Sequence, residues 1–131
     1  MSMISGIGHF ETSMATLEES GLIPALEEKV IQEQTPLLGI CLGMQMLTRG
    51  SEESPRPGLG WIAGETKRFA LPLNPGQRPM RIPHMGRNNV SIKQASPLVE
   101  NVPENTRFYF AHSYYATADS PEHIAAPTWY G

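Results

Sequence analysis

The sequence contains a single cysteine, Cys41, which lies between two glycines in residues 39–45 (GICLGMQ). A cysteine thiolate can attack an amide carbonyl carbon and form a thioester, which water then hydrolyses. The pattern G-x-C-x-G between an apolar segment and a helix is typical of a nucleophile elbow, with sulfur in place of a serine oxygen. The residues around Cys41 therefore indicate covalent catalysis by a thiol.

An elbow of this kind needs a strand that runs directly into a helix. Residues 37–40 are wholly apolar, which predicts a short strand buried on both faces, as in a parallel sheet. Residues 42–49 are predicted to form a helix that Gly50 ends. The flanking glycines relieve crowding in such a tight turn. The turn places the thiol at a helix N-terminus, where the positive end of the helix dipole favours a thiolate.

Two further groups are expected beside the thiol. The backbone N–H of Leu42, directly after the nucleophile, is free to donate to an oxyanion. Gln45 follows Cys41 by four residues and therefore lies on the same helix face. The alternative is a buried cysteine without a chemical role, because free cysteine is among the most buried residue types. The coincidence of two glycines, an apolar strand and a helix start favours the nucleophile.

The other predicted elements make the first third of the chain α/β and the rest largely β. Helices are predicted at residues 12–20 and from Pro24 onward, and residues 51–60, rich in Pro, Gly and Glu, are predicted to be a loop. Short strands are predicted at residues 61–63, 66–69, 80–82, 90–92, 107–111 and 114–117, with strand remnants at 3–4 and 124–126. Turns are predicted at residues 73–76, 86–89 and 103–105.

The composition excludes several classes of function. The 131 residues suit one domain, and a net charge of −3 without a Lys/Arg cluster argues against nucleic-acid binding. The apolar runs are too short to span a membrane, and the first residues show no secretory signal. One cysteine cannot form an internal disulfide, so a cytoplasmic location is expected.

Residues 38–45 (LGICLGMQ) resemble the active-site strand and elbow of class I glutamine amidotransferases. Further segments are similar, in order and spacing, to the HisH family of glutaminase subunits, and the likeness extends over nearly the whole chain. These segments are residues 6–8 (GIG), 58–61 (GLGW), 83–86 (PHMG) and 108–114 (FYFAHSY). The resemblance implies an α/β, flavodoxin-like amidotransferase domain over residues 1–131, incomplete at both termini, with a parallel sheet core and a β-rich second half.

The resemblance also implies a role for each matching residue. Cys41 would attack the side-chain amide of glutamine and release ammonia, and the backbone N–H groups of Ile7 and Leu42 would form the oxyanion hole. No metal or cofactor is expected. Substrate-binding residues would be Gly8, Gln45, Glu53, Ser113 and Tyr114, and residues at the partner interface would be Tyr109 and Arg87.

The function implied by the resemblance is that of a glutaminase subunit, which passes ammonia to a HisF-like cyclase for imidazole glycerol phosphate synthesis in histidine biosynthesis. A HisH-like subunit for sugar modification in surface polysaccharide is one alternative, since Arg87 replaces a tryptophan usual in the family. Ser5 also replaces the proline of the family's P-G-V-G loop. A non-catalytic fragment is another alternative, because these residues lack the H-P-E segment with the family's catalytic His and Glu. The 131-residue chain is therefore expected to release essentially no ammonia by itself.

Overall fold

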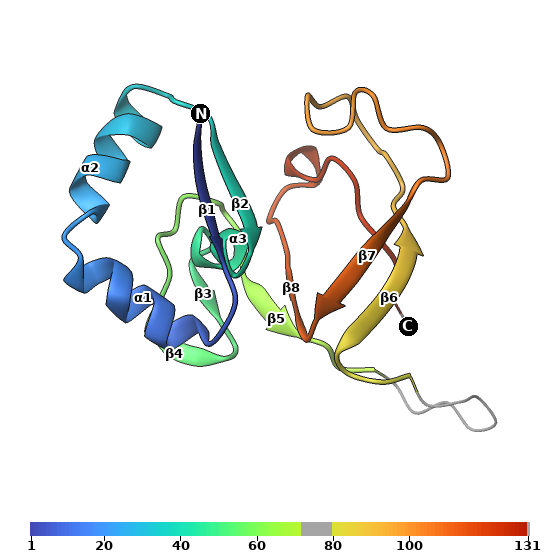
Figure 1. Cartoon of the computed structure of the whole chain (residues 1–131), viewed down its shortest axis with the longest axis horizontal. Helices are drawn as coiled ribbons and strands as arrows, with labels where there is room; N and C mark the ends of the chain where they lie inside the picture. The colour runs from blue at the N-terminus through green and yellow to red at the C-terminus, as the bar shows by residue number, and fades with distance from the viewer. Residues whose placement is uncertain (72–79, 131) are drawn as a thin grey trace.

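The computed structural model describes residues 1–71 and 80–130. The first part of the chain alternates strands and helices, and its two long strands lie side by side (Figure 1). Strand β2 pairs with β1 in parallel, with Cys41 opposite Gly6 at the last position. The elements of this part are β1 (Ser2–Gly6), α1 (Phe10–Glu19), α2 (Ile23–Glu27), the π-helical turn η1 (Glu28–Gln32), β2 (Leu37–Cys41) and α3 (Leu42–Met46).

The rest of the described chain consists mainly of short strands. They form a mixed four-stranded sheet in the order β4-β3-β5-β8 and an antiparallel pair β6-β7. The strands are β3 (Gly50–Ser51), β4 (Ser54–Pro57), β5 (Thr66–Arg68), β6 (His84–Asn89), β7 (Arg107–His112) and β8 (Tyr114–Ala116), followed by the 3-10 turn η2 (Pro121–His123). The predicted α/β class, with a parallel pair and a β-rich second half, is confirmed.

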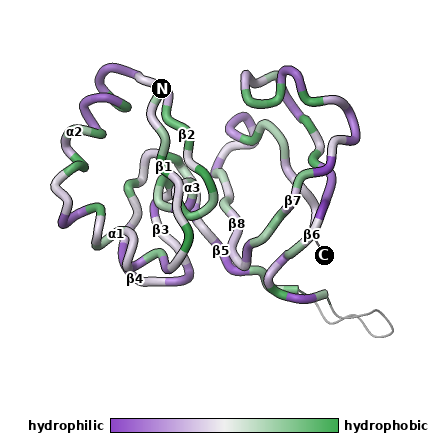
Figure 2. The backbone as a smooth tube through the Cα atoms, viewed as in Figure 1, coloured by the Kyte–Doolittle hydropathy of each residue, from purple (hydrophilic) through white to green (hydrophobic). Residues whose placement is uncertain are grey.

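A small apolar core lies beneath the elbow, between α1 and α3. Phe10 and Met14 of α1 are almost completely buried and pack against Leu42 and Met46 of α3. Figure 2 shows hydrophobic residues along β2 and into α3. Burial of these side chains removes apolar surface from water, which is the main favourable contribution to folding. The core thus fixes the helix that follows Cys41.

The two glycines of the elbow allow α3 to pack closely on the strands. A Cβ on Gly43 would overlap the carbonyl oxygen of Ile4 in β1. A Cβ on Gly39 would lie 2.8 Å from the Cα of Met44, also too close for a real contact. The prediction that glycines relieve crowding here is confirmed, and the crowding comes from backbone atoms of β1 and α3.

Side-chain contacts near α3 connect the first part of the chain to the later strands. The hydroxyl of Thr48 lies 3.1 Å from that of Thr66, and both residues are buried. The Arg49 guanidinium donates to both carboxylate oxygens of Asp119 and to Glu65. The hydrogen bond from Arg49 holds the pKa of Asp119 below its ordinary value. These ion pairs are half-exposed, so they fix relative position more than they add stability.

Several element predictions were wrong in detail. The strand at 37–40 is half-buried rather than buried on both faces, and Ile40 is 45% exposed, because β2 has one described neighbour and α3 covers one face. The helix predicted over 42–49 ends at Met46, and residues 51–60 contain β4 and part of β3. Residues 61–63, 80–82, 90–92 and 124–126 lie outside the named strands.

The predicted turn at 86–89 lies within β6, where Gly86 has a φ of +144° that glycine tolerates without strain. The strands predicted at 66–69, 107–111 and 114–117 are confirmed within a residue. The predicted turn at 73–76 lies outside the described residues. Within residues 1–71 and 80–130, every helix is too short or too polar to cross a membrane.

Candidate active site

Cys41 occupies the junction of β2 and α3 in a conformation that few residues other than glycine adopt. Its φ is +54° and its ψ is −117°, and it directly precedes the first helical residue. Such conformations cost on the order of 1–3 kcal/mol and are concentrated at functional sites. Cys41 is exposed. The alternative of a buried structural cysteine is therefore wrong.

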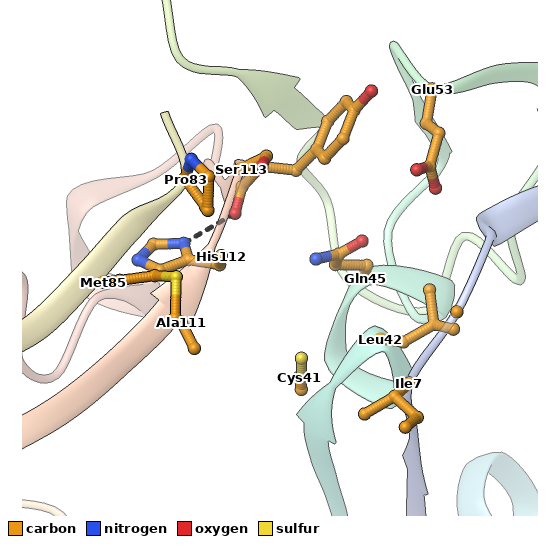
Figure 3. Close-up of a pocket in the computed structure, with 12 residues that line it drawn as sticks. Ile7, Cys41, Leu42, Gln45, Glu53, Pro83, Met85, Ala111, His112 and Ser113 are labelled. Carbon is orange, nitrogen blue, oxygen red and sulfur yellow. Dashed lines mark hydrogen bonds between the residues drawn. The ribbon is translucent and has the colours of Figure 1, made fainter. Parts of the chain in front are cut away.

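Cys41 opens into a pocket of about 300 Å³. Figure 3 shows its thiol pointing into the space between α3 and the β6–β7 pair. All the residues to which the sequence assigned a catalytic, oxyanion or substrate role line this pocket. They are Ile7, Gly8, Cys41, Leu42, Gln45, Glu53, Ser113 and Tyr114. Their roles stay predictions, but the fold brings them together from positions more than 100 residues apart.

Residues at the start of α3 and directly after β1 line the pocket beside the thiol. Leu42 begins α3, and the first N–H groups of a helix have no partner within the helix. Gly8 has a φ of +124°, so glycine is the residue that permits the backbone path between β1 and α1. Ile7 and Gly8 both line the pocket. The N–H of Leu42 is therefore available to a negatively charged oxygen, while donation by the N–H of Ile7 stays a prediction.

Glu53 joins the pocket to the start of α1. Its Oε2 accepts a hydrogen bond of 2.7 Å from the backbone N–H of Phe10, the first residue of that helix. A carboxylate at this position satisfies one of the free N–H groups and interacts favourably with the helix dipole. A carboxylate accepts several hydrogen bonds, so Glu53 can hold α1 and still face a cation in the pocket. Gln45, which is 8% exposed, lies at the base of the pocket.

Four lining residues were missing from the predicted set. They are Pro83, Met85, Ala111 and His112. The register of the β6–β7 pair explains their position, because Met85 pairs with Ala111 and His84 with His112. Seventeen residues separate the two strands in sequence, so no short turn signalled this pairing. The similarity of residues 83–86 and 108–114 to family segments was the signal that could have identified them.

Arg87 and Tyr109 lie elsewhere on the same strands. They are paired in the β6–β7 register, both are exposed, and neither lines the pocket. Tyr109 is 65% exposed and the nearby Met85 is 64% exposed.

The two imidazoles beside the pocket bond to each other. Nδ1 of His84 lies 3.1 Å from Nε2 of His112, and Nδ1 of His112 lies 2.8 Å from the carbonyl oxygen of Tyr114. Figure 3 draws the second bond as a dashed line. Burial of His84 lowers its pKa below the ordinary histidine value, and charge on His112 would lower it further.

His9 and His123 do not line the pocket. Within the part of the chain that the structure describes, no three His, Cys, Asp or Glu side chains are placed to hold a metal.

Comparison with known proteins identifies the class of protein that this fold and site define. The family model for glutamine amidotransferase class-I matches residues 5–129. The chain belongs to the class-I glutamine amidotransferase family.

Individual curated proteins are also similar to the chain. The chain is 45% identical over 128 residues to imidazole glycerol phosphate synthase subunit HisH 2 of Methanococcus maripaludis, covering 98% of this chain and 61% of that protein. It is 40% identical to subunit HisH 2 of Pseudomonas aeruginosa (98% and 61% covered) and 42% identical to subunit HisH of Thermosynechococcus vestitus (98% and 59%). The chain thus spans about three-fifths of the length of the curated relatives it matches.

Proposed function

We propose that this chain forms the nucleophile-bearing part of a HisH-type glutaminase subunit, which hydrolyses glutamine to glutamate and ammonia. The observation that supports it most strongly is the exposed Cys41, held in a rare backbone conformation and opening into a pocket with predicted oxyanion and substrate groups. The names of the similar curated proteins agree with this function.

The proposed reaction begins with attack of the Cys41 thiolate on the side-chain amide carbon of glutamine. The carbonyl oxygen becomes an oxyanion, which the N–H groups of Leu42 and Ile7 stabilise. Collapse of this intermediate breaks the C–N bond, and the nitrogen takes up a proton and departs as ammonia. The glutamyl group stays bound to Cys41 as a thioester. Water then attacks the thioester through a second oxyanion and releases glutamate and the thiolate.

Substrate selection is proposed to use the polar groups around the thiol. Glu53 faces the α-ammonium of glutamine while it also holds the N-terminus of α1. Gln45 and the backbone of Ser113 and Tyr114 bind the remaining polar atoms of the substrate. A site built to pair a substrate's charged group discriminates strongly against an analogue that lacks the group, since buried partners are then left unpaired.

The proton transfers need a general base, and the imidazole that lines the pocket is poorly suited to this role. His112 has one ring nitrogen bonded to Tyr114 and the other to His84. Neither nitrogen is free to take a proton from Cys41 without breaking this arrangement. We propose that the base comes from outside the described residues.

The proposed subunit passes its ammonia to a HisF-like cyclase partner. We define the docking surface as Met85, Arg87, Tyr109 and Ala111, which are exposed on the β6–β7 pair. Met85 and Ala111 also line the pocket. The surface is therefore continuous with the pocket, which would let ammonia leave Cys41 toward the partner.

Covalent labelling tests the nucleophile. An electrophilic glutamine analogue, such as the chloroketone, is expected to modify Cys41 at low concentration, and glutamine is expected to protect it. Since Cys41 is the sole cysteine of the chain, intact-mass spectrometry reports it directly. Labelling that glutamine does not slow would contradict a glutamine site.

Partner binding tests the docking surface. Tyr109→Ala is expected to weaken binding of the cyclase subunit from the same genome by tenfold or more, because exposed aromatic residues at interfaces contribute disproportionately to affinity. Titration calorimetry measures the affinity, and Trp129→Ala is a matched control, since Trp129 is 84% exposed outside this surface. Equal affinity of the Tyr109 variant and the native chain would place the interface elsewhere. Binding to a sugar-modifying synthetase instead would favour the polysaccharide alternative.

A further inference from the structure

His84 is enclosed by aromatic rings immediately behind the pocket. It is 4% exposed, and its ring stacks on that of Tyr130 with centroids 3.9 Å apart and on that of Phe110 at 5.0 Å. The Tyr130 hydroxyl in turn donates to the carbonyl oxygen of Arg81 at 2.6 Å. A side chain that only packed in this position would need no ring nitrogen, yet Nδ1 of His84 points at Nε2 of His112.

The partners of the two imidazoles determine where their protons lie. A carbonyl oxygen can only accept a hydrogen bond, so Nδ1 of His112 donates to the Tyr114 oxygen. A neutral His112 therefore has a lone pair at Nε2. For the 3.1 Å contact to be a hydrogen bond, Nδ1 of His84 must donate to that lone pair. In the neutral pair, both imidazoles carry their proton on Nδ1.

We propose that His84 is a positioning residue for the pocket, because its Nδ1–H fixes the orientation and tautomer of His112. The Nδ1–H of His112 in turn fixes the Tyr114 carbonyl, and so the backbone of residues 113–114. The Ser113 carbonyl is held independently by the N–H of Phe69, at 3.1 Å. The carbonyl of Ser113, between β7 and β8, and that of Tyr114, the first residue of β8, are thereby both fixed. This inference rests on the proposed function, in which that segment binds glutamine.

The pair is sensitive to protonation, because two doubly protonated imidazoles would point N–H groups at each other. The titratable groups that contact His84 are His112 from β7 and Tyr130 from the segment after η2, while Phe69 and Phe110 supply apolar surface. Burial lowers the pKa of His84 in the folded chain. The unfolded chain then binds more protons below about pH 6.5, so stability is full above that pH and falls as the pH decreases.

Nitrogen-15 NMR of the imidazole rings tests the proton positions in the natural protein. Above pH 7, both His84 and His112 are expected to show a protonated Nδ1 and an unprotonated Nε2. The signals of His9 and His123, which lie outside this pair, provide the reference within the same spectrum. A His112 protonated on Nε2 would overturn the proposal, whatever the activity of the protein.

Two variants separate positioning from packing. His84→Phe keeps a stacking ring without a donor, and His84→Asn keeps an N–H at the place of Nδ1 without the ring. His84→Phe is expected to raise the half-saturating concentration of the chloroketone analogue at Cys41 about tenfold, with iodoacetamide reactivity unchanged within twofold. It is also expected to flatten the loss of stability below pH 6.5. His84→Asn is expected to restore analogue binding to within threefold of the native protein.

The outcomes distinguish this inference from the proposed function. Native-like analogue binding by His84→Phe, or failure of His84→Asn to improve on it, would overturn the positioning role. If the analogue fails to label the native protein, the glutamine site is wrong, and the ring-nitrogen signals still decide the tautomers. If His84→Phe does not fold, the native spectra and the His84→Asn binding constant test the inference without it.

Discussion

Replacing Gly43 with alanine is expected to destabilise the folded protein by about 3 kcal/mol or more. The added Cβ would overlap the carbonyl oxygen of Ile4, and this atom belongs to the backbone of β1 rather than to a flexible side chain. Relief requires α3 to move away from the strands, which opens the apolar core around Leu42 and Met46. Chemical denaturation monitored by circular dichroism measures the change, and labelling of Cys41 by the glutamine analogue is expected to slow in parallel.

Gly6→Ala is the matched control for this prediction. Gly6 lies at the end of the same strand, and its added Cβ would meet one atom, Cδ2 of Leu42, at an ordinary distance of 3.9 Å. Its effect is expected to stay within about 1 kcal/mol, because alanine also reduces the entropy of the unfolded chain. If the two variants had equal stability, the close packing of α3 on β1 would be wrong.

The two elbow glycines, Gly39 and Gly43, show why the elbow could be predicted from the sequence. The close contact of Gly39 with Met44 lies within the strand-to-helix turn itself, so this steric demand appears in the local sequence, whereas that of Gly43 comes from Ile4 of the neighbouring strand β1. The side chain of Gln45 follows from helical periodicity for the same reason. The strand at 107–111 was also predictable, because aromatic residues are enriched in strands.

The far side of the pocket could not be predicted from local pattern. Its residues depend on the pairing of β6 with β7 across a long connection, and β6 contains Gly86 and two asparagines, Asn88 and Asn89, that are typical of turns. Tertiary pairing overrides that local preference. The half-exposed state of β2 was hidden for a related reason, since burial depends on which elements cover a strand and not on the strand's own residues.

The hydrogen bond from Phe10 to Glu53 illustrates a further limit. The acidic pair Glu52–Glu53 has the composition of a solvated loop, yet the two carboxylates have different partners. Glu53 accepts from the N–H of Phe10, and Glu52 accepts from that of Arg68. Sequence similarity pointed to Glu53 for its charge, whereas its contact with α1 depends on tertiary packing between residues 43 positions apart.

Turnover of glutamine is expected to fall on the order of 10⁶-fold in Cys41→Ser, because the nucleophile and its base act as one unit. No single His→Ala change within residues 1–131 is expected to reproduce that loss. His112→Ala is expected to cost at most about 10²-fold, the penalty of a substrate displaced by roughly an ångström. His123→Ala is expected to leave turnover unchanged, since His123 lies on the exposed turn η2. Coupled measurement of glutamate release checks all three variants in a protein that joins residues 1–131 to a family segment with the catalytic His and Glu.

Both ring nitrogens of His112 already take part in hydrogen bonds. A base for Cys41 needs a free lone pair within hydrogen-bond reach of the sulfur or of the attacking water. His112 has its Nε2 lone pair bonded to His84, which is itself buried behind it. The 131-residue chain alone is accordingly expected to release essentially no ammonia, even though it keeps the thiol and the pocket. If His112→Ala matched Cys41→Ser while the protein stayed folded, then His112 would be the base and the imidazole pair would break during each turnover.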